Sequence, residues 1–166
     1  MSIPMGVVAV PSYRVWRDGV VVDERADICE LWDEGMVGFL LGCSFSWEGV
    51  LQEAGLTPRQ IEEGCNVPMY ATTRRNKPVG PFGGRLVVSM RPYRPEQVDD
   101  VIRITQVYPG AHGGPVHWGA PEELGIASAA LATPDWGDAV SIHDGEVILP
   151  AGPGQGTSHL TYPLTD

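Results

Sequence analysis

Glycine and proline recur along the whole chain, and this feature constrains the fold more than any other. The 166 residues include 21 Gly and 15 Pro, more than a fifth of the total, with no low-complexity block. Glycine weakens helices and strands, and proline interrupts them. A helical bundle is therefore disfavoured, and we expect short helices and strands joined by many turns and ordered loops.

Five segments have the pattern of strands. The dipeptide Asp18-Gly19 separates two runs of β-branched and aromatic residues, 13–16 and 20–22, which predicts a hairpin. Residues 86–90 form a further strand candidate. A second hairpin is expected around Asp144-Gly145, with strands at 140–142 and 147–149.

Helix signals alternate with these strands. We expect a short helix from Asp27 through residue 32, and another that begins at Ser46 and ends at Gly55. Further helices should follow Pro58, Pro95 and Pro121, the one after Pro95 being amphipathic. The alternation predicts the α/β class with mixed α+β elements, and the length suits a single domain over residues 1–166.

Charge and cysteine content limit the partners and the compartment. The formal net charge of −10 disfavours nucleic acid and anionic membranes as partners, so a small-molecule substrate is expected. No apolar run reaches 18 residues, and the first residues lack a basic leader. Three cysteines without zinc-type spacing are typical of reduced thiols, and we expect a cytoplasmic protein.

The segment GCSFSWE, residues 42–48, is the first candidate for chemistry. It places the Cys43 thiol, the Ser44 hydroxyl and free N–H groups at the start of a helix. Such a helix start binds anions and can lower the pKa of a thiol. The alternative is a small buried cysteine with capping serines.

The second candidate is the segment HGGPVH, residues 112–117. Its two histidines, His112 and His117, flank a Gly-Gly-Pro turn that suits close approach of the backbone to a ligand. Either imidazole could act as general acid or base near neutral pH. Purely structural histidines remain an alternative, whereas a metal site would need a third ligand that the spacing does not supply.

Polar residues in the centre and near the C-terminus form a third set. Arg91 follows a strand, where it could clamp a carboxylate or form a surface ion pair. Asp135 lies in a turn, where it could cap the backbone or orient a histidine. Phosphate-loop and dinucleotide glycine patterns are absent from the sequence, so no nucleotide cofactor is indicated.

Several strings, taken in order, resemble the DUF1445 or D-glutamate cyclase-like hydro-lyase family. They are YRV with DG at 13–19, LWDEGMVGFLLGCSFSWE (31–48), IEEGCNVPMY (61–70), GRLVVSMRP (84–92), HGGPVHWGAPEELGI (112–126) and PDWGD (134–138). The resemblance covers roughly residues 13–148. It implies a layered α/β body with a small inserted α+β subdomain, here approximately 61–92.

The resemblance also implies an activity and a set of site residues. The family includes hydro-lyases and the D-glutamate cyclase that makes 5-oxo-D-proline. Its other members carry longer terminal segments, so a trimmed core with exposed apolar surface is expected to form a homodimer. The matching residues in this sequence are Cys43, Ser44, Ser46, Glu48, Asn66, Tyr70, Arg91, His112, His117, Asp135 and Asp138.

Together these features predict a lyase or cyclase without metal or cofactor, acting on a small carboxylate- or carbonyl-bearing substrate. The expected catalytic residues are His112 and His117 as acid and base, with Cys43, Ser44, Glu48 and Asp135; the expected substrate-binding residues are Ser46, Asn66, Tyr70 and Arg91. Ser44 and Ser46 would stabilise an oxyanion. GCSFSWE and HGGPVHWG should then line one pocket. The rival hypothesis is a non-catalytic binding or scaffold protein of the same family.

Overall fold

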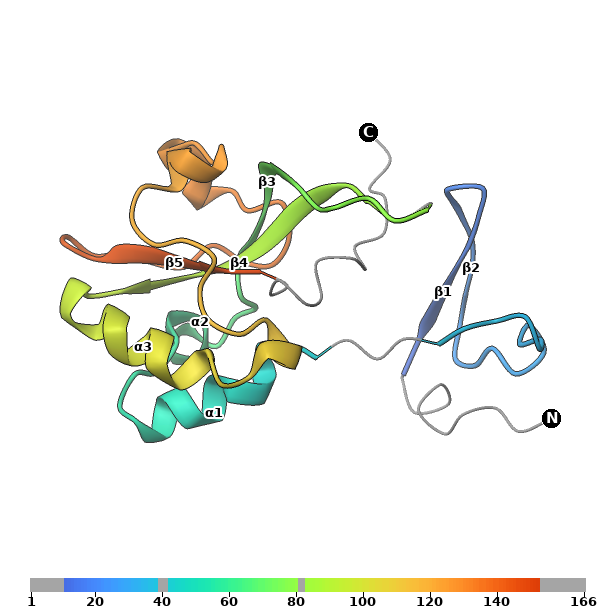
Figure 1. The fold of residues 1–166 in the computed structure, drawn as a ribbon, viewed down its shortest axis with the longest axis horizontal. Coiled ribbons are helices and arrows are strands. Elements are labelled where there is room, and N and C mark those ends of the chain that lie inside the picture. Colours follow the sequence, from blue (N-terminus) through green and yellow to red (C-terminus); the bar gives the residue numbers. More distant parts are fainter. Residues whose placement is uncertain (1–10, 39–41, 81–82, 153–166) are drawn as a thin grey trace. The chain divides into compact units, whose positions relative to one another are not determined.

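The computed structural model describes residues 11–38, 42–80 and 83–152 (Figure 1). The described residues divide into two compact units, residues 11–38 and residues 42–80 with 83–152. Each unit is described by itself, and the expected single domain stays a prediction. No helix among the described residues is long and apolar enough to cross a membrane.

The first unit contains the predicted hairpin. Strand β1 (Tyr13–Arg17) pairs antiparallel with β2 (Val20–Arg25). Asp18 and Gly19 have φ values of 50° and 76°, the left-handed conformation that a two-residue hairpin turn requires. The prediction of a short helix from Asp27 is wrong, because residues 28–32 form a turn. So few residues cannot offset the cost of helix nucleation.

The second unit is built on a three-stranded antiparallel sheet. Its order is β3 (Met69–Arg75), β4 (Arg85–Tyr93) and β5 (Val147–Ala151), with β4 in the centre. Strand β3, and all of β4 except Tyr93, fall within residues 61–92, and the small inserted subdomain expected there stays a prediction.

Helices cover one face of this sheet and 3₁₀ turns cover the other (Figure 1). On the helical side are α1 (Phe45–Glu53), α2 (Arg59–Glu63) and α3 (Val98–Thr105), the last preceded by the 3₁₀ turn η2 (Pro95–Gln97). The opposite face carries η4 (Pro121–Leu124) and η5 (Ser128–Ala132). The predicted class, a layered α/β fold with mixed α and β elements, is confirmed.

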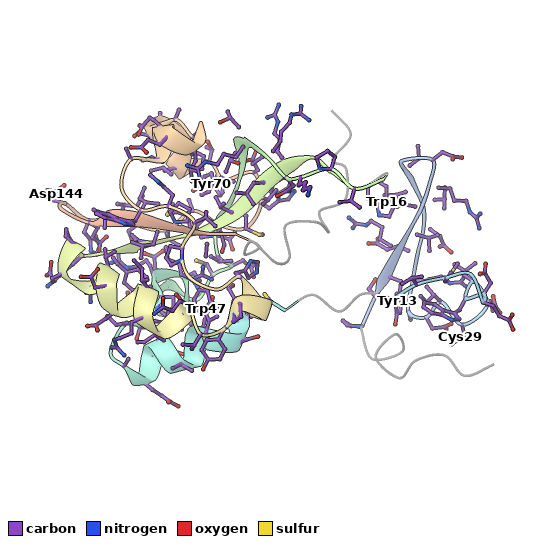
Figure 2. All side chains as sticks on the ribbon, viewed as in Figure 1. Tyr13, Trp16, Cys29, Trp47, Tyr70 and Asp144 are labelled. Carbon is purple, nitrogen blue, oxygen red and sulfur yellow. The ribbon has the colours of Figure 1, made fainter. Side chains whose placement is uncertain are left out.

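The alternation of residues along β4 separates two cores. Tyr93 packs with α1 and α3 in a cluster that includes Trp47, whereas Val88 and Met90 pack with Tyr70 and the 3₁₀ layer. Figure 2 shows Trp47 on the helical side and Tyr70 on the other. Ser89 and Arg91 share the Tyr93 face, so two polar side chains enter the helical core.

The predicted helix positions at Ser46 and Pro95 are confirmed, but the second predicted hairpin is wrong. Strand β5 pairs with β4, and residues 140–142 form no strand. That segment is held by α2 instead, because Arg59 Nη1 donates to the Ser141 carbonyl at 2.9 Å and Ser141 N donates to Glu63 Oε1 at 3.1 Å. Side-chain contacts distant in sequence outweigh the local turn signal.

Two loops flank opposite edges of the sheet. The loop that contains HGGPVHWG runs along β5, where Val116 N donates to the Pro150 carbonyl at 2.9 Å and Gly119 N to the Ile148 carbonyl at 3.1 Å. The PDWGD loop runs along β3, where Met69 N donates to the Trp136 carbonyl at 2.9 Å. Three strands therefore separate the two loops.

Gly137→Ala should destabilise the protein more than Gly145→Ala. Both glycines have positive φ, 77° and 83°, so alanine costs about 1–2 kcal/mol of backbone strain at either position. At Gly137 a Cβ would also lie 2.1 Å from the Val67 carbonyl oxygen, whereas at Gly145 nothing lies within 4 Å. Urea unfolding of the two variants should differ by a further ~1–3 kcal/mol; equal losses would contradict the packing of the PDWGD loop on β3.

Candidate functional site

A buried ion pair lies at the centre of the helical face. Arg91, only 2% exposed, donates through Nη2 to Glu48 Oε1 at 2.5 Å and to Ser44 Oγ at 2.9 Å. Its Nη1 donates to Ser89 Oγ at 3.0 Å. The sequence left a substrate clamp and a surface ion pair open; the structure instead pairs Arg91 with a buried carboxylate of the protein itself.

The spacing of residues on α1 explains how this cluster forms. Ser44, Trp47 and Glu48 occupy positions i, i+3 and i+4, which lie on one face of a helix. That face packs on the side of β4 that carries Ser89 and Arg91. The Trp47 ring centroid lies 4.7 Å from Arg91 Cζ, a cation–π distance. The spacing of these three residues therefore places all of them in contact with Arg91.

Glu48 is held by a second partner as well. Gln60 Nε2 donates to the same Oε1 at 2.9 Å, and the Glu48 side chain is 10% exposed. Two buried atoms of the cluster, Arg91 Nε and Gln60 Oε1, have no hydrogen-bond partner. The hydrogen bonds to a buried ion pair offset part of the cost of removing its charges from water. The stability of the Arg91–Glu48 pair therefore depends on all of these contacts.

His112 lies next to this cluster. It follows the 3₁₀ turn η3 (Pro109–Ala111) and has a φ of 74°, unusual for a residue other than glycine. Burial lowers the pKa of His112, Arg91 lowers it further, and the backbone of Gly152 opposes both. Its Nδ1 is buried without a hydrogen-bond partner. A neutral imidazole of this kind can accept a proton.

The GCSFSWE and HGGPVHWG regions, about 70 residues apart in sequence, meet at this point. Trp47 Nε1 donates to the Ala111 carbonyl at 2.8 Å. Gly42 lies against Gly110 so closely that a Cβ on Gly42 would be 2.0 Å from the Gly110 carbonyl oxygen. The two regions that sequence reasoning singled out are therefore neighbours, while the roles of their residues stay predictions.

Of the predicted residues in GCSFSWE, Cys43 and Ser46 lie outside the cluster, whereas Ser44 belongs to it. Cys43 is exposed and free, and Ser46 is exposed on α1. The Ser46 N–H donates to the Cys43 carbonyl at 3.0 Å, so it is already engaged in the first helical turn. Ser44 is buried, and its hydroxyl accepts from Arg91 rather than capping the helix.

His117 has a different setting from His112. Its Nε2 lies 3.0 Å from the Ala120 carbonyl oxygen, and its Nδ1 lies 3.9 Å from Glu123 Oε2. Ala120 directly precedes η4, and Glu123 lies within it. These contacts fix the imidazole locally, so His112 is the histidine that the structure associates with Arg91.

The remaining predicted residues lie at the β3 edge. Asp135 Oδ2 accepts from Ala71 N at 2.8 Å, and Asp138 Oδ2 accepts from Asn66 N at 2.8 Å. The Tyr70 hydroxyl donates to the Leu131 carbonyl at 2.7 Å, and burial, aided by Asp135, raises the pKa of Tyr70 to about 12. The Asp135 contact attaches the PDWGD loop to β3, the Asp138 contact attaches it to the segment before β3, and the Tyr70 hydrogen bond joins β3 to η5.

The placement of Asp135 corrects one hypothesis. Its carboxylate binds the backbone of β3, at the edge opposite the histidine loop on β5, so it does not orient a histidine. The carboxylate accepts from one backbone N–H, that of Ala71, which agrees with the capping alternative that the sequence left open.

Sequence reasoning missed three members of the cluster, Trp47, Gln60 and Ser89. Ser89 could have been predicted, since it lies two residues before Arg91 on the same strand and therefore shares its face of β4. Trp47 lies inside GCSFSWE but carries no titratable group. Gln60 gave no signal. Within residues 11–38, 42–80 and 83–152, no group of three His, Cys, Asp or Glu side chains could hold a metal ion.

Comparison with known proteins identifies the family. Residues 37–152 match the sequence profile of the D-glutamate cyclase family. A Bordetella pertussis protein named "Putative hydro-lyase" is 53% identical over 83% of this chain and 49% of its own length. Proteins of that name from Mycolicibacterium gilvum and Rubrobacter xylanophilus are each 54% identical over 83% of this chain and 52% of their own length. The chain thus spans about half the length of these relatives, and it belongs to the D-glutamate cyclase family.

Proposed function

We propose that this chain acts in a cofactor-independent lyase or cyclase, which removes or adds water, or closes a ring, on a small carboxylate- or carbonyl-bearing substrate. The family match and the hydro-lyase names of the relatives support the reaction class. The observation that carries the proposal is His112, whose Nδ1 is buried and unpartnered beside the Arg91–Glu48 pair.

His112 is the proposed base. In an elimination it takes the acidic proton next to the substrate carbonyl. The protonated imidazole then returns that proton to the departing hydroxyl, which leaves as water. In ring closure of an amino dicarboxylate it takes a proton from the ammonium group, and the nitrogen attacks the distal carboxyl carbon. The protonated imidazole returns that proton to a carboxyl oxygen. The C–O bond then breaks, and this oxygen leaves as water with the second amine proton. The positive N-terminal end of α1, next to the His112 turn, favours the negative charge that develops on oxygen.

Arg91 has a different role in this proposal from the clamp expected from sequence. Its Nη groups hold Ser44, Glu48 and Ser89, and its charge helps to keep His112 neutral. Arg91 therefore positions the Ser44 hydroxyl and tunes the base. The catalytic roles predicted for His117 and Cys43, and the substrate-binding role predicted for Ser46, remain part of this proposal.

The reaction class is tested by incubating the protein with D-glutamate and with small 2-hydroxy dicarboxylates. Product formation, including 5-oxo-D-proline from D-glutamate, is followed by proton NMR. We expect turnover of at least one substrate without added nucleotide or metal, and turnover that persists in EDTA. Binding of these compounds without turnover would favour the non-catalytic binding protein instead.

The pH dependence of kcat/KM should reflect the neutral form of His112. Protonation abolishes a base, so the rate falls as pH falls through the pKa of His112. Because burial and Arg91 lower that pKa, the fall should lie below the ordinary histidine value of about 6.5. A pH profile with an acid limb centred above about 6.5 would contradict a buried neutral His112 as the base.

A further inference from the structure

We propose that Trp47 is a positioning residue, which holds the turn before His112 against the Arg91–Glu48 pair. Its effect on turnover rests on the proposed function, but its effect on the His112 imidazole does not. Trp47 lies on α1 among the side chains of the helical face (Figure 2).

Trp47 contacts both parts of the site with one rigid side chain. It is 2% exposed, its indole N–H donates to the Ala111 carbonyl at 2.8 Å, and its ring lies 4.7 Å from Arg91 Cζ. Tryptophan has two side-chain torsions, so fixing its ring fixes its N–H as well. The distance between Arg91 and the Ala111 peptide is thereby set by Trp47.

The turn that Trp47 holds has a conformation that needs support. Among the described residues, only Asp18 and His112 have positive φ without being glycine, and Asp18 lies in a hairpin turn that requires it. His112 directly follows the Ala111 carbonyl that accepts from Trp47. A residue in this conformation persists only where its surroundings fix it. Backbone hydrogen bonds from Ala111 N and Gly113 N to the Tyr108 carbonyl close the turn, and the indole hydrogen bond to the Ala111 carbonyl attaches it to α1.

A second contact, made by Gly42, also holds this turn. Gly42 packs against Gly110, and a Cβ added there would lie 2.0 Å from the Gly110 carbonyl oxygen and 3.0 Å from Ala111 Cα. Gly42→Ala therefore forces a shift at the contact between residue 42 and the Gly110–Ala111 backbone, whereas Trp47→Phe removes the hydrogen bond to the Ala111 carbonyl. The two changes provide independent tests of one constraint.

Because of its surroundings, the pKa of His112 depends on whether Trp47 holds the turn in place. Arg91 is the charged group that faces the imidazole, with Glu48 paired to it at 2.5 Å, and the Gly152 backbone approaches from β5. A released turn would let the imidazole gain water and move from Arg91. Both changes raise the pKa of His112 toward its ordinary value. A side chain that only fills the core would not have this effect.

Trp47→Phe keeps a buried ring and removes the N–H. We expect histidine NMR titration of the full chain to show a raised pKa for His112, and kcat to fall about 10- to 100-fold with KM little changed. Trp136→Phe is the matched control, because Trp136 is 40% exposed at the β3 edge and should leave both quantities unchanged. Circular dichroism first establishes that each variant is folded.

Gly42→Ala, compared with Gly49→Ala, is the second test. Gly49 lies on α1 with nothing within 4 Å of an added Cβ, so its variant should titrate like the wild type, whereas Gly42→Ala should raise the pKa of His112. Unchanged titration of His112 in folded Trp47→Phe and Gly42→Ala would overturn the positioning role, as would loss of folding in both. A raised pKa in a protein without turnover would keep this role and refute the proposed function.

Discussion

Replacement of Glu48 by Gln should lower the free energy of unfolding by about 3–5 kcal/mol. Arg91 is 2% exposed, and Glu48 is its only carboxylate partner among the described ion pairs. Without that carboxylate the guanidinium charge stays buried and uncompensated, although the amide of the new Gln can still accept a hydrogen bond. Urea unfolding at pH 7, followed by circular dichroism, measures the loss.

The exposed pair Arg103–Asp100 is the matched control. Its side chains are 67% and 58% exposed, so Asp100→Asn should cost less than about 1 kcal/mol. The double variant Glu48→Leu with Arg91→Met should recover most of the stability lost by Glu48→Gln, because neither charge remains. A cost for Glu48→Gln no larger than that for Asp100→Asn would contradict the buried pair.

The local elements of this fold could be predicted because their signals lie within a few residues. The Asp18-Gly19 turn, the start of α1 and the amphipathic spacing after Pro95 each follow from neighbouring residues. The order β3-β4-β5 could not, because strand pairing depends on residues far apart. The Asp144-Gly145 turn predicted a local hairpin, but Arg59 and Glu63 hold one of its expected strands against α2.

The candidate site was predictable in part for the same reason. GCSFSWE and HGGPVH were singled out because reactive side chains lie beside flexible turns, and the structure brings the two regions together. The partner of Arg91 could not be predicted, since an arginine after a strand pairs equally well with a substrate or with Glu48. The position of Asp135 at the β3 edge could not be predicted, because the number of residues between Asp135 and the histidines does not indicate which edge of the sheet it occupies.

His112→Asn should lower turnover by roughly 10²- to 10⁴-fold while leaving the protein folded. Asparagine removes the base but tolerates the left-handed backbone, so the φ of 74° at this position should persist. His117→Gln should lower turnover much less, because the Nε2 atom of His117 already lies 3.0 Å from the Ala120 carbonyl oxygen. Initial rates at saturating substrate give kcat for each variant.

Asp135→Asn provides the sharpest comparison. Its carboxylate lies at the β3 edge and binds the Ala71 N–H, so an amide oxygen can replace it and turnover should stay near that of the wild type. The central measurement is therefore kcat of folded His112→Asn relative to folded Asp135→Asn on the same substrate. A ratio of roughly 10⁻² or lower is the predicted result; equal turnover in the two variants would contradict the assignment of the site to the His112–Arg91–Glu48 cluster.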